Sequence, residues 1–345
     1  MKRDKLAKIF IFGTLVVSIN ILTVSVRWDW PWSKGWKKNG PLVNGAVNET
    51  FASILTALTP VSTKGETHTH RTYLISQTRC TQKVFLLIMV FTAPANYDRR
   101  RVIRKTWATD PSMQIRWKTV FLIGQAVGDS IQNQYLDAEG EIHRDLIRGA
   151  QNEGYNNLTL KTQMGLEWAA KYCDFEFLLK ADDDVFVNPY KLLDYLEKPD
   201  TPKTKLYTGS CWHGKTPWRE EKYGVSYEEY NKTTYPDFCA GPAYLLSSDL
   251  VHKLVDMFAV NKRPFKLEDV YIGMLVEKMG DVKALLHPSF RHAVQCKLAP
   301  DTISHHSASV QCMEELFSLA MKEKVEYELV QLRSVKTVGR NNTLN

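Results

Sequence analysis

Phe177-Leu-Leu-Lys-Ala-Asp-Asp-Asp-Val-Phe-Val-Asn188 is the stretch that decides the fold. It places three consecutive aspartates, Asp182, Asp183 and Asp184, between two apolar runs. A strand is predicted over Phe175–Lys180, because an apolar run without alternation is typical of a parallel strand buried on both faces. The aspartates then follow the carboxyl end of that strand, where α/β sheets bind their ligands.

Strand and helix patterns alternate on both sides of this stretch. Continuous apolar runs predict two more strands, over Val84–Phe91 and Lys118–Gly124. Helical or amphipathic segments are expected over Ala95–Trp107, Ala138–Ile147, Leu158–Tyr172 and Glu268–Met279. Strands that alternate with helices indicate an α/β fold with a mostly parallel sheet.

The three aspartates are the first candidate site. Like charges packed together cost folding free energy unless a cation or hydrogen-bond donors offset them. Carboxylate oxygens suit Mg²⁺ or Mn²⁺, which would keep open positions for a diphosphate. His305 and His306 could add a nitrogen ligand. The alternatives are a solvated turn for the aspartates and a surface turn for the histidine pair.

The helix expected after the first strand is rich in arginine, with Arg99, Arg100, Arg101 and Arg104. Guanidinium groups recognise phosphate through paired hydrogen bonds, so this helix could meet diphosphate or uracil groups. The alternative is a solvated basic face. The position of the helix, directly after a predicted parallel strand, favours the first interpretation.

A second acidic pair, Glu268 and Asp269, opens the helix that runs to Met279. Carboxylates at a helix N-terminus commonly serve as caps, since they complement the helix dipole. The functional interpretation is a general base that takes a proton from an acceptor hydroxyl. The local pattern leaves both interpretations open.

The net charge of the 345-residue chain is +7, which invites a nucleic-acid hypothesis. The first 40 residues hold eight Lys or Arg against two Asp, so they carry +6 of that excess. The remaining 305 residues carry only +1, although this average would allow a local basic patch. The charge distribution therefore argues against nucleic-acid binding.

Those basic residues flank an uncharged apolar run, Ile9–Val26. As a helix it would be about 27 Å long, enough for a thin bilayer. Four positive residues precede it, so the N-terminus is expected in the cytosol and the bulk of the chain in the lumen. A cleaved signal peptide and a buried core helix are the alternatives. A cluster of tryptophans follows, as suits the headgroup region: Trp28, Trp30, Trp32 and Trp36.

The predicted organisation follows from this anchor. It comprises a cytoplasmic tail at 1–8, a transmembrane signal anchor at 9–26, a luminal stem at 27–79, a catalytic domain at 80–333 and a C-terminal tail at 334–345. The stem is rich in Thr, Ser, Gly and Asn without sustained periodicity, which is typical of a linker. Four Asn-x-Ser/Thr sequons are candidates for glycosylation: Asn48, Asn157, Asn231 and Asn341.

All six cysteines lie beyond the stem. The absence of any Cys-x-x-Cys spacing makes a zinc site improbable. An even number of cysteines in a luminal domain suggests up to three disulfides. Pairs between Cys211 and Cys239, and between Cys296 and Cys312, would close modest loops, but the sequence does not choose among the alternatives.

Six blocks in order resemble one known family, the inverting β-1,3-galactosyltransferases and β-1,3-N-acetylglucosaminyltransferases, to which the Fringe enzymes are related. Residues 100–107 resemble its RxxIRxTW motif, and residues 155–162 its YxNLTxKT block. Residues 177–188 resemble its metal motif, residues 235–247 its YPxYCxGxxYxLS block, and residues 268–273 its EDVYxG block. Trp168 and Cys173 fall at family positions. The resemblance covers residues 84–313.

The resemblance implies a GT-A fold, a Rossmann-like nucleotide-diphospho-sugar transferase with one catalytic domain. It further implies a UDP-sugar donor, Mn²⁺, a glycan acceptor, and a single-pass type II protein of the Golgi or endoplasmic reticulum membrane. Asp182, Asp184 and His306 would serve the metal; His306 is preferred to His305 because Ser309 and Met313 keep the family spacing. The implied donor-site residues are Arg100, Arg104, Asp183 and Lys161, with Trp107 packed beneath the arginines.

Asp269 takes the place of the family's catalytic base, and Glu268 is the second choice. Ala181, Glu153, Pro242 and Ala243 depart from the family pattern, and the last two could alter the sugar pocket. Galactose is the expected donor sugar, because the EDVYIG and YNNLTLKT blocks are closest to galactosyltransferases. The alternatives are N-acetylglucosamine or N-acetylgalactosamine as donor sugar, and an inactive relative that acts as a chaperone or lectin.

Overall fold

A computed structural model describes residues 73–74, 78, 80–110, 115–261, 263–292 and 295–341, with side chains up to residue 329. These residues belong to one compact unit, His68–Asn345. The predicted cytoplasmic tail and anchor, and nearly all of the stem, lie outside the described residues. Within the described part, no helix combines the length and the apolar character needed to cross a bilayer.

An eight-stranded sheet forms the centre of this unit, in the order β1-β4-β3-β2-β5-β8-β7-β9. Its strands are β1 Tyr73–Leu74, β2 Val84–Phe91, β3 Trp117–Gln125, β4 Leu146–Asn152, β5 Phe175–Asp182, β7 Tyr207–Trp212, β8 Phe238–Ser247 and β9 Ala284–Leu286. The four central strands β4, β3, β2 and β5 are parallel, whereas β8 runs antiparallel to both β5 and β7. The predicted α/β fold with a mostly parallel sheet is confirmed.

A second, three-stranded sheet has the order β10-β11-β6. It consists of β6 Val185–Val187, β10 Phe290–His292 and β11 Ser304–His306. Because β6 begins three residues after β5 ends, the second sheet lies next to the three aspartates. It brings residues near position 306 to the acidic stretch.

The helices connect and cover these strands. They are α2 Tyr97–Lys105, α3 Ser130–His143, η2 Tyr155–Asn157, α4 Leu158–Tyr172, α5 Pro189–Glu197, α6 Ser248–Val260, α7 Glu268–Met279 and α8 Val310–Asn341. The bounds of β2, α4 and α7 agree with the predictions residue for residue. α8 continues through the expected domain end at residue 333 as far as Asn341.

One predicted element is wrong. The amphipathic segment expected over Ala138–Ile147 divides into the end of α3 and the beginning of β4. Arg144 adopts a left-handed conformation with φ of 52° and its N–H donates to the carbonyl of Gly140, which ends the helix. The apolar pair Leu146 and Ile147 belongs to the buried strand that follows.

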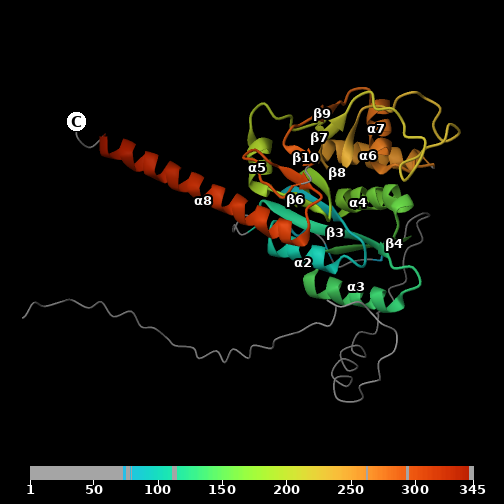
Figure 1. Cartoon of the computed structure of the whole chain (residues 1–345), viewed down its shortest axis with the longest axis horizontal. Helices are drawn as coiled ribbons and strands as arrows, with labels where there is room; N and C mark the ends of the chain where they lie inside the picture. Colours follow the sequence, from blue (N-terminus) through green and yellow to red (C-terminus); the bar gives the residue numbers. More distant parts are fainter. Residues whose placement is uncertain are drawn as a thin grey trace, which may run out of the picture. The chain divides into compact units, whose positions relative to one another are not determined.

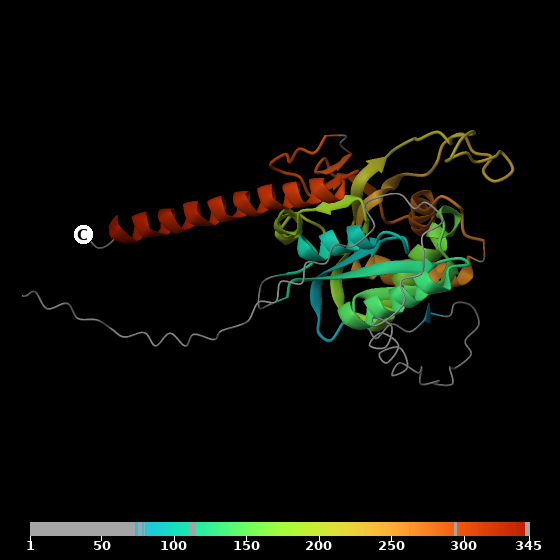
Figure 2. The ribbon, with the colours of Figure 1, turned by 60° about the horizontal axis from the view of Figure 1, so that its bottom comes forward.

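The uninterrupted apolar run of β2 is explained by cores on both faces of the sheet. Leu86, Ile88 and Val90 contribute to a core with side chains of α2, α5 and α8. The alternate residues of the strand contribute to a second core with α4, α6 and α7. Figures 1 and 2 show α2 and α3 on one face of the sheet and α4 with α6 on the other.

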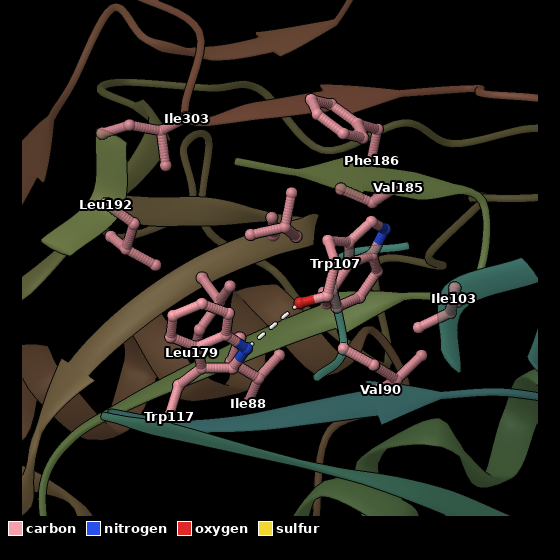
Figure 3. Close-up of a cluster of buried hydrophobic side chains, with 14 of the residues drawn as sticks. Ile88, Val90, Ile103, Trp107, Trp117, Leu179, Val185, Phe186, Leu192 and Ile303 are labelled. Atoms are coloured by element: carbon pink, nitrogen blue, oxygen red, sulfur yellow. Dashed lines mark hydrogen bonds between the residues drawn. The ribbon is translucent and has the colours of Figure 1, made fainter. Parts of the chain in front are cut away.

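Trp107 lies at the centre of the first core and is fully buried. Figure 3 shows it among Ile103, Val90 and Phe186, and its carbonyl accepts a hydrogen bond from Trp117 Nε1 at 3.1 Å. The expectation that this indole packs beneath the arginine helix is therefore confirmed.

Three disulfides link Cys80 to Cys173, Cys211 to Cys239, and Cys296 to Cys312. The two pairs predicted from the sequence are confirmed. The bond from Cys211 to Cys239 joins β7 to β8 and closes the segment between these strands.

The order of the central strands creates a switch point between β2 and β5. From β2 the chain builds outward through β3 and β4, then returns to place β5 on the other side of β2. The carboxyl ends of β2 and β5 lie side by side at this point, which is where open α/β sheets bind ligands. Asp183 N–H donates to the carbonyl of Phe91 across this point at 3.0 Å.

Candidate active site

Asp183 occupies the switch point and is held from the loop and helix that follow β2. Its Oδ1 accepts a hydrogen bond from Arg99 Nη1 at 2.7 Å, and its Oδ2 accepts one from Asn96 Nδ2 at 2.8 Å. The side chain is only 7% exposed. This bonding neutralises the carboxylate within the protein and leaves little of it for the contact with donor ribose or sugar that was expected.

Asp184 points toward the second sheet. Its Oδ1 lies 3.7 Å from His306 Nε2, and its Oδ2 lies 3.7 Å from Arg99 Nη1. His306 is 29% exposed, whereas His305, on the opposite face of β11, is 1% exposed. The fold thus brings Asp184 together with His306, the histidine that was preferred from the sequence.

His292 extends this group from β10. Its Nδ1 lies 3.2 Å from Nδ1 of His306. In the parallel register of β10 and β11, these two histidines are Cα partners. The sequence carried no signal for this contact, because residues 292 and 306 become neighbours only when their strands pair.

The carboxylate and imidazole of Asp184 and His306 fit a divalent ion in part. An oxygen and a nitrogen donor face each other at a distance that one ion could bridge, and this donor set suits Mn²⁺. Asp182, the third predicted ligand, is engaged elsewhere. Among the residues described, no three His, Cys, Asp or Glu side chains surround one common point.

Lys180 is the partner of Asp182 and was missed in the sequence. Its Nζ donates to Asp182 Oδ1 at 2.6 Å and also to the carbonyl of Gly241. The side chain is 4% exposed and its ammonium lies over the rings of Phe91 and Tyr244, 4.7 and 5.9 Å from their centroids. A lysine inside an otherwise apolar strand run was the available signal, since a buried cation needs a partner.

Gly241 connects the aspartates to the second acidic pair. Its carbonyl accepts from Lys180, and its N–H donates to Asp269 Oδ2 at 3.0 Å. A continuous path of hydrogen bonds therefore runs from Asp182 through Lys180 and Gly241 to Asp269. The antiparallel pairing of β8 with β5 makes this path, because it places Gly241 beside the end of β5.

Asp269 and Glu268 occupy different environments at the start of α7. Glu268 is 7% exposed and accepts hydrogen bonds from Tyr244 Oη at 2.6 Å and Thr162 Oγ1 at 2.9 Å. Burial, with the charge of Asp269, raises the pKa of Glu268 to about 7. Asp269 is only partly buried; its oxygens accept from the N–H groups of Gly241 and Val270.

Burial also raises the pKa of Asp269, against the backbone hydrogen bonds and the charge of Lys180. An accessible carboxylate with a raised pKa has the properties of a general base. Glu268 has both of its hydroxyl contacts on one oxygen and is shielded from solvent. The geometry therefore favours Asp269 over Glu268 in this role, in the order that the resemblance implied.

Arg100 and Arg104 face the protein interior, which corrects the expected donor contacts. Arg100 has no exposed side-chain surface, and its guanidinium donates to both oxygens of Glu139 and to the carbonyls of Ala93 and Pro94. Arg104 pairs with Asp145 at 2.7 and 2.9 Å and with Glu139 at 2.7 Å. These contacts hold α2 to α3, to Asp145 and to the loop after β2.

Lys161 has a similar position. It is 3% exposed, and its Nζ donates to both oxygens of Glu153 at 2.6 and 2.7 Å and to the carbonyl of Thr92 at 3.1 Å. Burial lowers its pKa. Lys161 and Arg100 therefore both donate hydrogen bonds to the loop after β2. The arginine of α2 that reaches the aspartates is Arg99.

The sequons are placed as follows. Asn231 is exposed in the segment between β7 and β8. Asn157 is partly buried and its Nδ2 donates to the carbonyl of Asn152 at 2.9 Å. Asn341 is the last residue of α8, and Asn48 lies outside the described residues.

Comparisons with known proteins identify related sequences. Residues 98–284 match the family model described as galactosyltransferase. The chain is 33% identical over 247 residues to beta-1,3-galactosyltransferase 1 of Homo sapiens, covering 70% of this chain and 72% of that protein. It is 35% identical over 223 residues to human lactosylceramide 1,3-N-acetyl-beta-D-glucosaminyltransferase, covering 61% and 59%.

These matches define the class as a glycosyltransferase. The chain belongs to the galactosyltransferase family. Solved structures with lower similarity include the galactosyltransferase LgtC in complex with donor and acceptor sugar analogs. That structure is 11% identical with a TM-score of 0.35, over 67% of this chain and 95% of that chain.

Proposed function

We propose that this protein transfers galactose from UDP-galactose to the 3-hydroxyl of an acceptor sugar on a glycoprotein or glycolipid, and forms a β-1,3 bond with inversion. The observation that carries the proposal is the partly exposed Asp269, joined through Gly241 and Lys180 to the aspartates at the switch point. The name of the galactosyltransferase relative supports galactose. The name of the second relative supports the alternative donor UDP-N-acetylglucosamine, and UDP-N-acetylgalactosamine is a further alternative.

In the proposed reaction, Asp269 accepts the proton of the acceptor 3-hydroxyl. The acceptor oxygen bonds to the anomeric carbon on the face opposite UDP, while the bond from that carbon to the diphosphate breaks and its electron pair leaves with UDP. The anomeric centre inverts because this is a single displacement. Hydrogen bonds from the N–H groups of Gly241 and Val270 fix the orientation of the base.

The leaving diphosphate would meet Arg99 at the switch point. Arg99 reaches both Asp183 and Asp184 and is 37% exposed, so it can offset charge that develops on a phosphate. A divalent ion such as Mn²⁺, held by Asp184 and His306 with Asp182 as the further predicted ligand, would supply the same charge stabilisation. Lys180 keeps Asp182 in place within the protein.

The fold and location that we propose follow from the same features. A switch point that carries the candidate site supports a GT-A domain. Three disulfides support an oxidising compartment. We therefore propose a type II protein of the Golgi or endoplasmic reticulum membrane, anchored through residues 9–26, with residues 80–333 in the lumen.

The test is a donor screen on the full chain in detergent with Mn²⁺. UDP release is measured with UDP-galactose, UDP-N-acetylglucosamine and UDP-N-acetylgalactosamine, with and without sugar acceptors, and proton NMR of the product gives linkage and anomeric configuration. We expect acceptor-stimulated release from UDP-galactose and a β-1,3 product. Faster release from another donor would select that alternative, and no release from any donor would favour an inactive chaperone or lectin.

A further inference from the structure

The end of β7 and the segment between β7 and β8 carry an unusual set of exposed aromatic side chains. Their exposed fractions are 45% for Trp212, 54% for Trp218, 48% for Tyr223 and 66% for Tyr227. In Figures 1 and 2 this segment, drawn in yellow, extends away from the sheet. Exposed aromatic surface that gathers in one place commonly marks a binding site.

The inner end of this aromatic surface is a contact between the segment and η2. The rings of Tyr155 and Tyr223 meet edge to face at 6.1 Å, and Lys222 Nζ lies 4.9 and 5.3 Å from their centroids. Burial, together with the negative charges of Asp269, Glu268 and Asp182, raises the pKa of Tyr155.

Two hydrogen bonds join the start of α4, the helix that follows Tyr155, to residues at and just before the start of α7. α4 follows η2 directly, and its residues Thr159 and Thr162 donate to the carbonyl of Phe265 at 2.7 Å and to Glu268 Oε1 at 2.9 Å. The start of α4 is therefore bound to the start of α7. Tyr155 precedes Thr159 by four residues, so it belongs to the part of the chain that this contact brings toward α7.

The outer end is a pair of tryptophans around a lysine. Lys215 Nζ lies 4.6 Å from the Trp212 centroid and 5.7 Å from the Trp218 centroid. Trp212 pairs with Phe238 in the β7–β8 register. Phe238 precedes Gly241 by three residues, so Trp212 lies about 10 Å along the strand from the glycine that bonds Asp269. That span suits several linked sugars better than one.

The segment is braced from within. The guanidinium of Arg219 donates to four backbone carbonyls, those of Val225, Ser226, Tyr230 and Lys232. The disulfide from Cys211 to Cys239 closes its base. A surface ordered before binding loses less entropy when a ligand arrives.

We propose that Tyr155, Tyr223, Trp212 and Trp218 form an acceptor platform that binds the sugars behind the one that receives the transferred residue. This inference rests on the proposed function. A pyranose ring has an apolar C–H face, which packs on aromatic rings, and hydroxyls at its edge, which Lys215 and Lys222 can reach. Residues 212–238 hold four Lys or Arg against five Asp or Glu, a balance that suits a neutral glycan better than a polyanion.

The first test compares acceptors of two lengths. Trp218→Ala and Trp212→Ala are assayed as full chains with methyl glycosides of galactose, N-acetylglucosamine, N-acetylgalactosamine and mannose, and with tetrasaccharides that end in the same sugars. We expect KM for the tetrasaccharide to rise about 3–10-fold per tryptophan lost, with kcat within about twofold and KM for the methyl glycoside little changed. Trp218→Phe should retain most of the affinity.

Tyr135→Ala, which removes an exposed ring from α3, is the matched control and should change neither constant. Equal KM values for long and short acceptors in the parent chain, or tryptophan variants that leave the tetrasaccharide KM unchanged, would overturn the platform. Calorimetric titration of the same tetrasaccharides in the presence of UDP tests the platform without turnover. Absence of UDP release with every donor would instead count against the proposed function alone.

Discussion

The two groups of carboxylates on either side of Gly241 are neutralised in different ways. Asp182 and Asp183 pair with cationic side chains, Lys180 and Arg99. Glu268 and Asp269 accept hydrogen bonds from hydroxyls and backbone N–H groups at a helix N-terminus.

The difference separates two kinds of chemistry. Asp182 and Asp183 lie beside cations and close to Asp184 in the chain, an arrangement that suits the binding of ions and phosphates. Glu268 and Asp269 have raised pKa values because the effect of burial outweighs that of their hydrogen bonds and of the charge of Lys180, and raised pKa values suit proton transfer. One edge of the sheet therefore carries a candidate ion- and phosphate-binding group beside a candidate general base. The two are connected through Gly241, whose carbonyl accepts from Lys180 and whose N–H donates to Asp269.

The largest expected effect removes the proton acceptor. Asp269→Asn should lower kcat by about 10²–10⁴, because the amide keeps the hydrogen bond from Gly241 but cannot take up a proton. Binding of UDP with Mn²⁺, measured by calorimetry, should be largely retained. Normal turnover in this variant would show that Asp269 is not the base.

The parent enzyme adds a pH test to that prediction. Because the pKa of Asp269 is raised, kcat/KM should fall as pH decreases through it, since only the ionised carboxylate accepts a proton. The acid limb of the profile should disappear in the residual activity of Asp269→Asn. A limb that persists unchanged in this variant would belong to another group.

The next largest effect is expected from removing Lys180, which connects the two groups of carboxylates. Lys180→Met should lower the free energy of unfolding by about 2–3 kcal/mol, less than for a fully buried pair because Asp182 remains 36% exposed. Denaturant unfolding measures this change. The double variant Lys180→Met with Asp182→Asn should regain most of the stability but not the activity. Wild-type turnover in the double variant would contradict a role for this connection.

Glu268 gives a stability test of the comparison. Its folded pKa of about 7 lies above the unfolded value, so the native state holds the proton more tightly and stability falls as pH rises from about 4.5 to 7. Glu268→Gln keeps an oxygen for Tyr244 and Thr162 and should be about 2–3 kcal/mol more stable than the parent at pH 8. Calorimetric melting across this pH range measures the difference.

Glu139 is the control, because its pKa is shifted in the opposite direction from that of Glu268. Hydrogen bonds and charges from Arg100 and Arg104 lower its pKa against the effect of burial. Glu139→Gln should therefore destabilise the protein at neutral pH, with a loss that shrinks as pH falls below about 4. If Glu268→Gln and Glu139→Gln change the stability in the same direction at pH 8, the distinction between the two environments is contradicted.

The smallest expected effect concerns the ion. His306→Ala should raise the Mn²⁺ concentration needed for half-maximal activity by about tenfold, since one of the proposed donors is lost. His252→Ala, an exposed histidine on α6, is the control and should leave the requirement unchanged. An unaltered Mn²⁺ titration in His306→Ala would remove this histidine from the proposed site.

Local sequence predicted the fold well where one periodicity dominated. β2, α4 and α7 are clear runs with defined ends, and their bounds agreed with the structure. The region over Ala138–Ile147 failed because the last turns of a helix and the first residues of a strand share an apolar pattern when read together. Only the left-handed Arg144 separates them, and sequence patterns do not reveal its conformation.

The site was harder to predict because its contacts are tertiary. Asp184 and His306 were selected from motif spacing, and the fold places them 3.7 Å apart. Arg99 and Arg100 are neighbours in the sequence, yet one faces the aspartates and the other pairs with Glu139. Choosing between them requires the position of α3, just as the role of Lys180 requires the pairing of β8 with β5.

The disulfide from Cys211 to Cys239 makes the proposed glycan-binding segment a product of maturation. Closing a loop of this length stabilises a protein by about 3–4 kcal/mol in the chain-entropy model. A newly made chain would reach its final selectivity for long acceptors only after oxidation of this pair. The choice of acceptor would then depend on whether this disulfide has formed. A chain in which Cys211 and Cys239 remain reduced would differ in the acceptors that it glycosylates.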